Sequence, residues 1–214
     1  MNTTSSLSQA EIWTAADLAT RFGPLSLSRI CLDPLPGTGT EADVVRWEAR
    51  ENRLFELVDG VLVEKTLGFY EAYLASLLVT QLTTFARAHD LGIVAGADAM
   101  MRLTPGLVRI PDASFVSWGR LPNRQIPRDP IPSLVPDLAV EVISKSNTTE
   151  EMDRKLVDYF RAGVQLVWFV RPDAQSVDVY SSPSSFKTTH KALDGGRVLP
   201  GFELSLGDLF REST

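Results

Sequence analysis

The sequence has few of the cysteine and histidine residues that stabilise a fold through disulfides or bound metal ions. Cys31 is the only cysteine, which excludes a disulfide within the chain and fits a reducing cytoplasm. The two histidines, His89 and His190, lie far apart, and with a single cysteine they argue against a structural zinc site. Stability must therefore come from a hydrophobic core, which 214 residues with 44% hydrophobic side chains can supply within one main domain.

Long apolar runs and an excess of positive charge are also absent. No apolar stretch approaches the length that spans a bilayer, and the N-terminus lacks a basic region followed by an apolar one. We therefore expect no membrane segment, no signal peptide and a cytoplasmic location. The net charge of −6 weighs against tight binding of nucleic acid by a monomer, because phosphate contacts need Lys and Arg. The best candidates for such contacts surround the proline-rich residues 122–136: Arg102, Arg109, Arg120, Arg124 and Arg128.

The order of predicted elements indicates an α/β fold, with a mixed central sheet flanked by helices. Apolar spacing predicts helices over residues 9–22, 41–50, 69–90 (closed by Gly92) and 149–162 (closed by Gly163). Asp59-Gly60 between two apolar runs predicts a two-residue hairpin. Strand patterns follow at 92–96, 98–103, 108–118, 137–144, 164–170, 176–181 and 186–193, with a last strand and helical turn in 200–210. We expect residues 1–50 to form an N-terminal helical extension and residues 51–214 the main domain.

Two carboxylates stand where the strand patterns require apolar side chains. Glu141 lies within the apolar run DLAVEVIS, where alternation places it on one face with Ala139 and Ile143. A buried, unpaired carboxylate costs several kcal/mol, so Glu141 needs a metal ion or a basic partner. Asp112 follows Pro111 in VRIPDASFV, and because proline removes a backbone donor, this strand is either interrupted there or lies near an edge. A break at Pro111 could leave Asp112 at the mouth of a cleft.

Lys155 lies at the margin of the apolar stripe of the helix predicted over 149–162, one position before Leu156. Its long stem can follow the apolar face while its ammonium approaches Glu141. Two carboxylates and a lysine form a complete hydrolytic set: the acids bind Mg²⁺ or Mn²⁺, the metal activates water, and the lysine orients that water or stabilises phosphate charge. Glu56 and Glu71 are further candidate ligands.

Each of these residues also has a purely structural interpretation. Glu141 could form an ion pair with Lys or Arg, Asp112 could belong to a Pro-Asp turn, and Lys155 could be a solvated helix residue. Glu56 could be an exposed hairpin residue, and Glu71 a first-turn acid favoured by the helix dipole.

The ordered series of motifs resembles the family of putative restriction endonucleases, a bacterial group in the PD-(D/E)xK nuclease superfamily. The motifs are ELVDG at 56–60, VRIPDASFVS at 108–117, PDLAVEVIS at 136–144, a D-x-K-xxx-Y-xxx-GV pattern at 153–164, VWFV at 167–170 and PGFEL at 200–204. The resemblance covers roughly residues 50–210. It implies a restriction-endonuclease-like fold and divalent-metal-dependent cleavage of DNA, with Asp112 and Glu141 as the metal-binding acids.

The chain departs from the superfamily pattern at two places. The lysine expected two residues after the strand acid is replaced by Ile143, and the family resembled here supplies it from the following helix, which Lys155 matches. Lys145 is a nearby alternative to Lys155 as the active-site lysine. Many relatives carry a histidine near the start of the first long helix, where this chain has Phe69-Tyr70-Glu71.

The leading hypothesis is a cytoplasmic Mg²⁺-dependent endodeoxyribonuclease. A homodimer is expected, because cutting both strands of a duplex suits two-fold symmetry. The first alternative is a catalytically silent nucleic-acid-binding or regulatory module on the same fold. The second is an unrelated α/β protein in which Glu141 merely pairs with Lys155.

Overall fold

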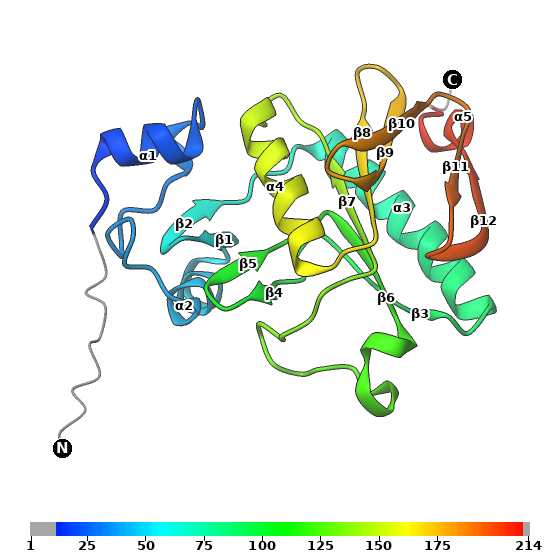
Figure 1. Ribbon diagram of the computed structural model, residues 1–214, viewed down its shortest axis with the longest axis horizontal. Coiled ribbons are helices and arrows are strands. Elements are labelled where there is room, and N and C mark those ends of the chain that lie inside the picture. Colours follow the sequence, from blue (N-terminus) through cyan, green and yellow to red (C-terminus); the bar gives the residue numbers. More distant parts are fainter. Residues whose placement is uncertain (1–11, 212–214) are drawn as a thin grey trace.

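A six-stranded mixed sheet forms the centre of the molecule in the computed structural model, which describes residues 12–211 (Figure 1). The strand order is β10-β9-β8-β7-β6-β3, and β7 and β8 are the parallel pair within it. The strands are β3 (Gly92–Ala95), β6 (Ala113–Ser117), β7 (Leu138–Val142), β8 (Leu166–Arg171), β9 (Ser176–Ser182) and β10 (Ser185–Thr189). Every residue of β7 is buried, as its near-continuous apolar sequence predicts.

Two helices cover the two faces of this sheet, which confirms the predicted fold class. Helix α4 (Thr149–Ala162) is the crossover that a parallel pair requires, and its Met152 and Leu156 pack with Ala139 of β7. Helix α3 (Phe69–Ala88) packs on the opposite face, where Leu78 contributes to the largest core cluster. Gly92 does not cap α3 as predicted. It begins β3, where a Cβ atom would stand 2.1 Å from the carbonyl oxygen of Val116.

A second sheet of four strands lies beside α4, in the order β2-β1-β5-β4. Its strands are β1 (Phe55–Val58), β2 (Val61–Glu64), β4 (Met101–Thr104) and β5 (Leu107–Arg109). The predicted hairpin is confirmed: Asp59 and Gly60 have φ of 51° and 73°, which a two-residue turn of this kind requires. The predicted strand 108–118 is interrupted at Pro111, so β5 joins this sheet and β6 the six-stranded one. Asp112 lies at the junction.

The N-terminal segment packs on the four-stranded sheet. It contains α1 (Ala15–Phe22), a 3₁₀ turn η1 (Leu27–Arg29) and α2 (Glu41–Glu51). Helix α1 begins later than predicted because Thr14 forms its capping box, and predicted positions 9–11 lie outside the described residues. The backbone N–H of Cys31 donates to the carbonyl of Leu62 at 2.9 Å, which joins the segment to β2. The domain boundary near residue 50 stays a prediction.

The C-terminal part forms a small hairpin against α3. A bend at residues 190–191 separates β10 from β11 (Ala192–Gly195), so the prediction of one strand over 186–193 is wrong. Strand β11 pairs with β12 (Leu199–Ser205), and the short helix α5 (Leu206–Leu209) follows. The proline-rich segment contains the 3₁₀ turn η3 (Pro122–Arg124), just after η2 (Trp118–Arg120), and an isolated bridge between Ser133 and Arg102. Between residues 12 and 211, no helix combines the length and apolar character needed to cross a bilayer.

Replacing Gly60 by Ala is expected to destabilise the fold more than replacing Gly106. Both glycines have positive φ, of 73° and 77°, so each Ala carries the left-handed penalty of about 1 kcal/mol. A Cβ at position 60 would also stand 2.4 Å from the carbonyl oxygen of Gly37, whereas position 106 is open. The Gly60→Ala loss in the free energy of unfolding, measured with urea, should exceed that of Gly106→Ala by roughly 1–3 kcal/mol. Equal losses would show that the N-terminal segment does not dock on the hairpin.

Candidate active site

Four of the five predicted site residues meet in a buried layer between the two sheets and α4. They come from four different places: Glu56 from β1, Asp112 from the β5–β6 junction, Glu141 from β7 and Lys155 from α4. Their exposed fractions are only 2%, 3%, 4% and 4% in that order. Two structural alternatives are therefore wrong, because Glu56 is not an exposed hairpin residue and Lys155 is not a solvated helix residue.

The ammonium of Lys155 bridges two carboxylates that belong to different sheets. Its Nζ atom lies 3.0 Å from Oε1 of Glu56 and 3.1 Å from both carboxylate oxygens of Glu141. The contact between Lys155 and Glu141 that the sequence predicts is present. The hydroxyl of Tyr159, one turn further along α4, donates to Oε1 of Glu141 at 2.5 Å. Tyr159 is a core residue, as expected, but it also fixes this carboxylate.

Arg109 is the third cation of this layer, and its place inside the protein was not predicted. One guanidinium nitrogen lies 2.7 Å from Oε2 of Glu56, and another lies 2.5 Å from Oδ2 of Asp158 on α4. The backbone N–H of Ile110 donates to Oε1 of Glu56 at 3.2 Å. All the acceptor positions of Glu56 are thus directed at donors of β5 and α4.

Asp112 is held by the backbone of β7 and by a lysine that sequence reasoning missed. Its backbone N–H donates to the carbonyl of Val140 at 2.9 Å, and its Oδ2 accepts the N–H of Val142 at 2.6 Å. Asp112 thus bonds to Val140 and Val142, the two residues of β7 on either side of Glu141. Its other oxygen, Oδ1, lies 2.7 Å from Nζ of Lys65, which also donates to the carbonyl of Ile110. Asp112 is buried here, not at the mouth of a cleft.

One signal in the sequence could have identified Lys65. The buried residues Val61 and Val63 alternate along β2, and the next position on the same face is Lys65. A lysine that continues a buried alternation needs an acidic partner, just as Glu141 does.

The two glutamates that share Lys155 have opposite pKa shifts. Burial alone would raise the pKa of Glu56, but the charges of Lys155, Arg109 and Lys65 outweigh it and lower the pKa from 4.5 to about 2. Burial raises the pKa of Glu141, and the positive charges of Lys155 and Lys65 offset this only in part. The negative charges of Asp112 and Glu56 raise the pKa of Glu141 further. The pKa of Glu141 is thus raised mainly by burial, although two ammonium groups lie nearby.

An open cleft of 740 Å³ is lined by residues that lie close in sequence to members of this cluster. Thr66, which follows Lys65, and Ser144, which lies two positions after Val142, line the cleft together with Arg29. We refer to it as the Thr66–Ser144 cleft. Glu71, the fifth predicted site residue, lines this cleft from the start of α3 and lies outside the set of contacts around Lys155. Lys145 also lines it and is exposed, so the alternative lysine lies on the rim.

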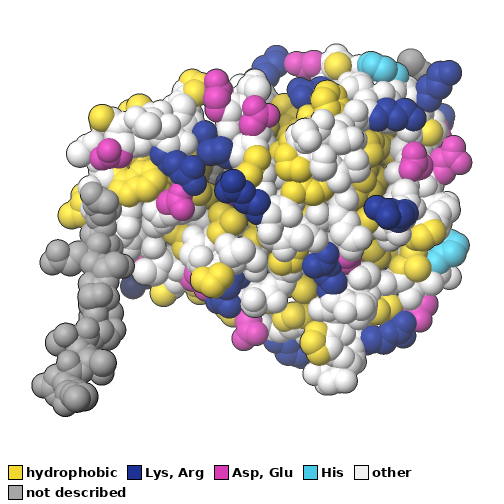
Figure 2. Space-filling view, viewed as in Figure 1, with side chains coloured by type: hydrophobic (Ala, Val, Ile, Leu, Met, Phe, Trp, Pro, Cys, Tyr) yellow, Lys and Arg dark blue, Asp and Glu magenta, His cyan; other side chains and the backbone are white. Residues whose placement is uncertain are grey.

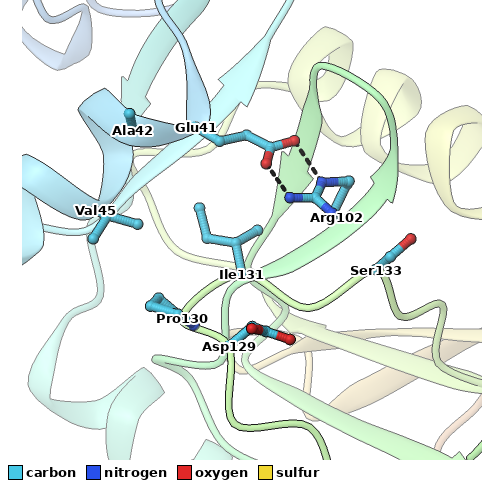
Figure 3. A pocket seen from close by; sticks show the side chains of 8 residues that line it. All are labelled: Glu41, Ala42, Val45, Arg102, Asp129, Pro130, Ile131 and Ser133. Carbon is cyan, nitrogen blue, oxygen red and sulfur yellow. Dashed lines mark hydrogen bonds and ion pairs between the residues drawn. The ribbon is translucent and has the colours of Figure 1, made fainter.

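The arginines around the proline-rich segment are not free for phosphate contacts as predicted, because most of their side chains are paired with acids. Four arginines contact carboxylates: Arg102 with Glu41, Arg109 with Glu56 and Asp158, Arg120 with Asp137, and Arg124 with Asp90. Figure 3 shows Glu41 and Arg102 joined across a second cavity, of 490 Å³, between α2 and this segment. Arg128 is exposed. On the face drawn in Figure 2, basic side chains lie scattered among acidic ones.

A model of the Uma2 family, described as putative restriction endonucleases, matches residues 42–207. The chain belongs to this family. Among solved structures, it is similar to a putative nuclease of the DUF820 group from Anabaena variabilis, with a TM-score of 0.64 and 19% identity. That match covers 73% of this chain and 89% of the other, and it supports the restriction-endonuclease-like fold. No curated protein matches the sequence significantly.

Nucleases with a restriction-endonuclease-like fold generally use divalent metals, and the Asp112–Glu141 pair fits such an ion. Carboxylate oxygens are the ligands that Mg²⁺ prefers, and Mg²⁺ is commonly held by one or two carboxylates together with waters and substrate phosphate. Burial is the largest cause of the raised pKa of Glu141, and a divalent cation beside this carboxylate would favour its charged form. Among residues 12–211, no three His, Cys, Asp or Glu side chains are grouped to hold an ion by themselves. Water and phosphate would therefore complete the coordination.

Replacing Glu56 by Gln is expected to cost roughly 3 kcal/mol of folding free energy at neutral pH, from the shift of its pKa to about 2. Because the folded-state pKa lies below the unfolded value of 4.5, this stabilisation is present above pH 4.5 and is lost as the pH falls toward 2. In urea unfolding experiments, the difference in the free energy of unfolding between wild type and Glu56→Gln should decrease as the pH falls from 4.5 toward 2.

Glu141→Gln is the matched comparison. The pKa of Glu141 is raised, so the folded state tolerates a neutral side chain there better, and this variant should cost less than Glu56→Gln at neutral pH. A pH-independent cost for Glu56→Gln, or the reverse ranking of the two variants, would contradict this distribution of charge.

Proposed function

We propose that this protein is an endonuclease that hydrolyses DNA phosphodiester bonds with Mg²⁺ or Mn²⁺, and that Asp112 and Glu141 are its metal ligands. The observation that carries the proposal is the pair of buried carboxylates at the β5–β6 junction and on β7, joined through the hydrogen bond of Asp112 to Val142, in a chain of a nuclease family. Buried acids side by side repel one another, and function is a common reason for retaining them.

The surrounding residues would hold the two acids in position. When bound, a divalent metal acidifies water and neutralises phosphate charge. Lys155 and Tyr159 fix the carboxylate of Glu141 from one side, and Glu56 in turn holds the ammonium of Lys155. We assign Lys155 and Glu56 as positioning residues, because the Lys155 ammonium is already shared between two carboxylates. The backbone N–H of Val142 orients Asp112.

The DNA backbone would lie in the Thr66–Ser144 cleft, where hydroxyl groups and Lys145 offer donors to phosphate. We assign Glu71 to the rim of this cleft, not to the metal. A homodimer would place two such clefts on the two strands of a duplex. These assignments, like the cytoplasmic location, belong to the proposal.

A catalytically silent module is the second candidate function. It is favoured by the ammonium groups that already neutralise the acids, Lys65 at Asp112 and Lys155 at Glu141, and by the net charge of −6. Membership in the Uma2 family removes the second alternative, an unrelated α/β protein.

Asp112→Asn and Glu141→Gln are each expected to abolish metal-dependent nicking of plasmid DNA. The rate should fall by more than the roughly 10–100-fold that loss of an outer-shell partner of a metal site costs. Nicking by the wild type should require Mn²⁺ or Mg²⁺ and stop with EDTA.

Asp178→Asn is the matched control, because Asp178 is also buried, at 4% exposed, but pairs with Arg171 across the neighbouring strands β8 and β9. This variant should retain activity, with circular dichroism to verify folding of all three. Cleavage that survives both site substitutions would refute the site assignment. DNA binding without cleavage by the wild type would favour the silent module.

A further inference from the structure

Lys65 contacts Oδ1 of Asp112, the oxygen that accepts no backbone hydrogen bond and is the freer of the two to bind a metal ion. The other oxygen, Oδ2, accepts the backbone N–H of Val142 at 2.6 Å, so the fold itself fixes it. Oδ1 faces Nζ of Lys65 at 2.7 Å, and the side chains of Lys65 and Asp112 are 7% and 4% exposed. An ammonium and a divalent cation repel one another strongly at such distances, so both cannot contact Oδ1 at the same time.

The two buried lysines are held by different sets of partners. Lys155 contacts the carboxylates of both Glu56 and Glu141. Lys65 contacts one carboxylate, that of Asp112, and the uncharged carbonyl of Ile110. Removal of Lys155 from its place would leave two buried carboxylates without their shared cation. Movement of Lys65 would leave only Asp112 without its paired cation, and a divalent cation that binds there would neutralise the Asp112 charge.

A cleft lies next to Lys65 in the sequence. Lys65 directly follows the strand β2, which ends at Glu64, and the next residue, Thr66, lines the cleft of 740 Å³. A lysine stem can remain along apolar surface while the ammonium turns toward solvent. The exchange requires that rotation of this side chain carry the ammonium from the Asp112 carboxylate toward the cleft proposed for the DNA backbone.

We propose that Lys65 is an exchangeable occupant of the metal site. Its ammonium neutralises Asp112 in the metal-free protein, gives way when a divalent cation binds, and then contacts a substrate phosphate in the Thr66–Ser144 cleft. The last step rests on the proposed nuclease function. Lys65 would thereby supply a mobile lysine in a chain that has Ile143 where the common superfamily pattern has lysine.

Lysine acylation by an N-hydroxysuccinimide ester, read residue by residue with mass spectrometry on the full chain, tests the exchange without relying on activity. Lys65 should react slowly without metal and several-fold faster with Mn²⁺. Lys155 should stay protected in both conditions, and the exposed Lys187 should react in both. A phosphorothioate oligonucleotide added with Mn²⁺ should protect Lys65 again, and unchanged reactivity would overturn the phosphate contact.

Calorimetric titration with Mn²⁺ provides the second measurement. Lys65→Met should bind Mn²⁺ at least about tenfold more tightly than the wild type, because no ammonium competes for Asp112. Lys187→Met, which removes a distant lysine, should bind like the wild type.

The outcomes separate this inference from the proposed function. Mn²⁺ binding with no change in Lys65 reactivity, and no gain in Lys65→Met, would overturn the exchange alone. Absence of Mn²⁺ binding by both the wild type and Lys65→Met would overturn the exchange and the metal site together. Exchange without any DNA cleavage would support the role of Lys65 and count against the nuclease.

Discussion

The ammonium of Lys155 between Glu56 and Glu141 is the interaction on which the rest of the structure depends. Glu56 belongs to the four-stranded sheet, Glu141 to the six-stranded sheet and Lys155 to α4, so this one cation joins three layers. Buried ions are tolerated only when their partners are correctly placed. The β7–α4–β8 crossover and the break at Pro111 therefore have to bring these strands together in one arrangement.

The charges of the buried layer balance without a metal ion, but they are distributed unevenly. Three carboxylates, Glu56, Asp112 and Glu141, face the three cations Lys65, Lys155 and Arg109. The cations lower the pKa of Glu56, whereas burial and neighbouring acids raise that of Glu141. The protein can thus fold with its own cations in place and still gain from a divalent cation beside Glu141.

Local sequence patterns predicted most elements and the acids of the buried layer, but not all of their partners. A carboxylate within an apolar strand, as at Glu141, can be recognised from its immediate neighbours. Arg109 and Glu56 are separated by 53 positions and come from strands whose pairing no local pattern specifies, so their contact could not be predicted. Lys65 continues a buried face of β2 and could have been identified from it, but its contact with Asp112 could not be predicted from a local pattern. The interruption at Pro111 was recognisable because proline removes a backbone donor. Element ends, such as that of α3, depend on turn geometry and were less accurate.

Diffraction from crystals soaked in Mn²⁺, with data collected at the manganese absorption edge, tests the central claim most directly. The account predicts an anomalous peak within coordination distance of Oδ1 of Asp112 and a carboxylate oxygen of Glu141, with the Lys65 ammonium moved into the Thr66–Ser144 cleft. An anomalous map without a peak at these two carboxylates, with Lys65 still on Asp112 at high Mn²⁺ concentration, would contradict it.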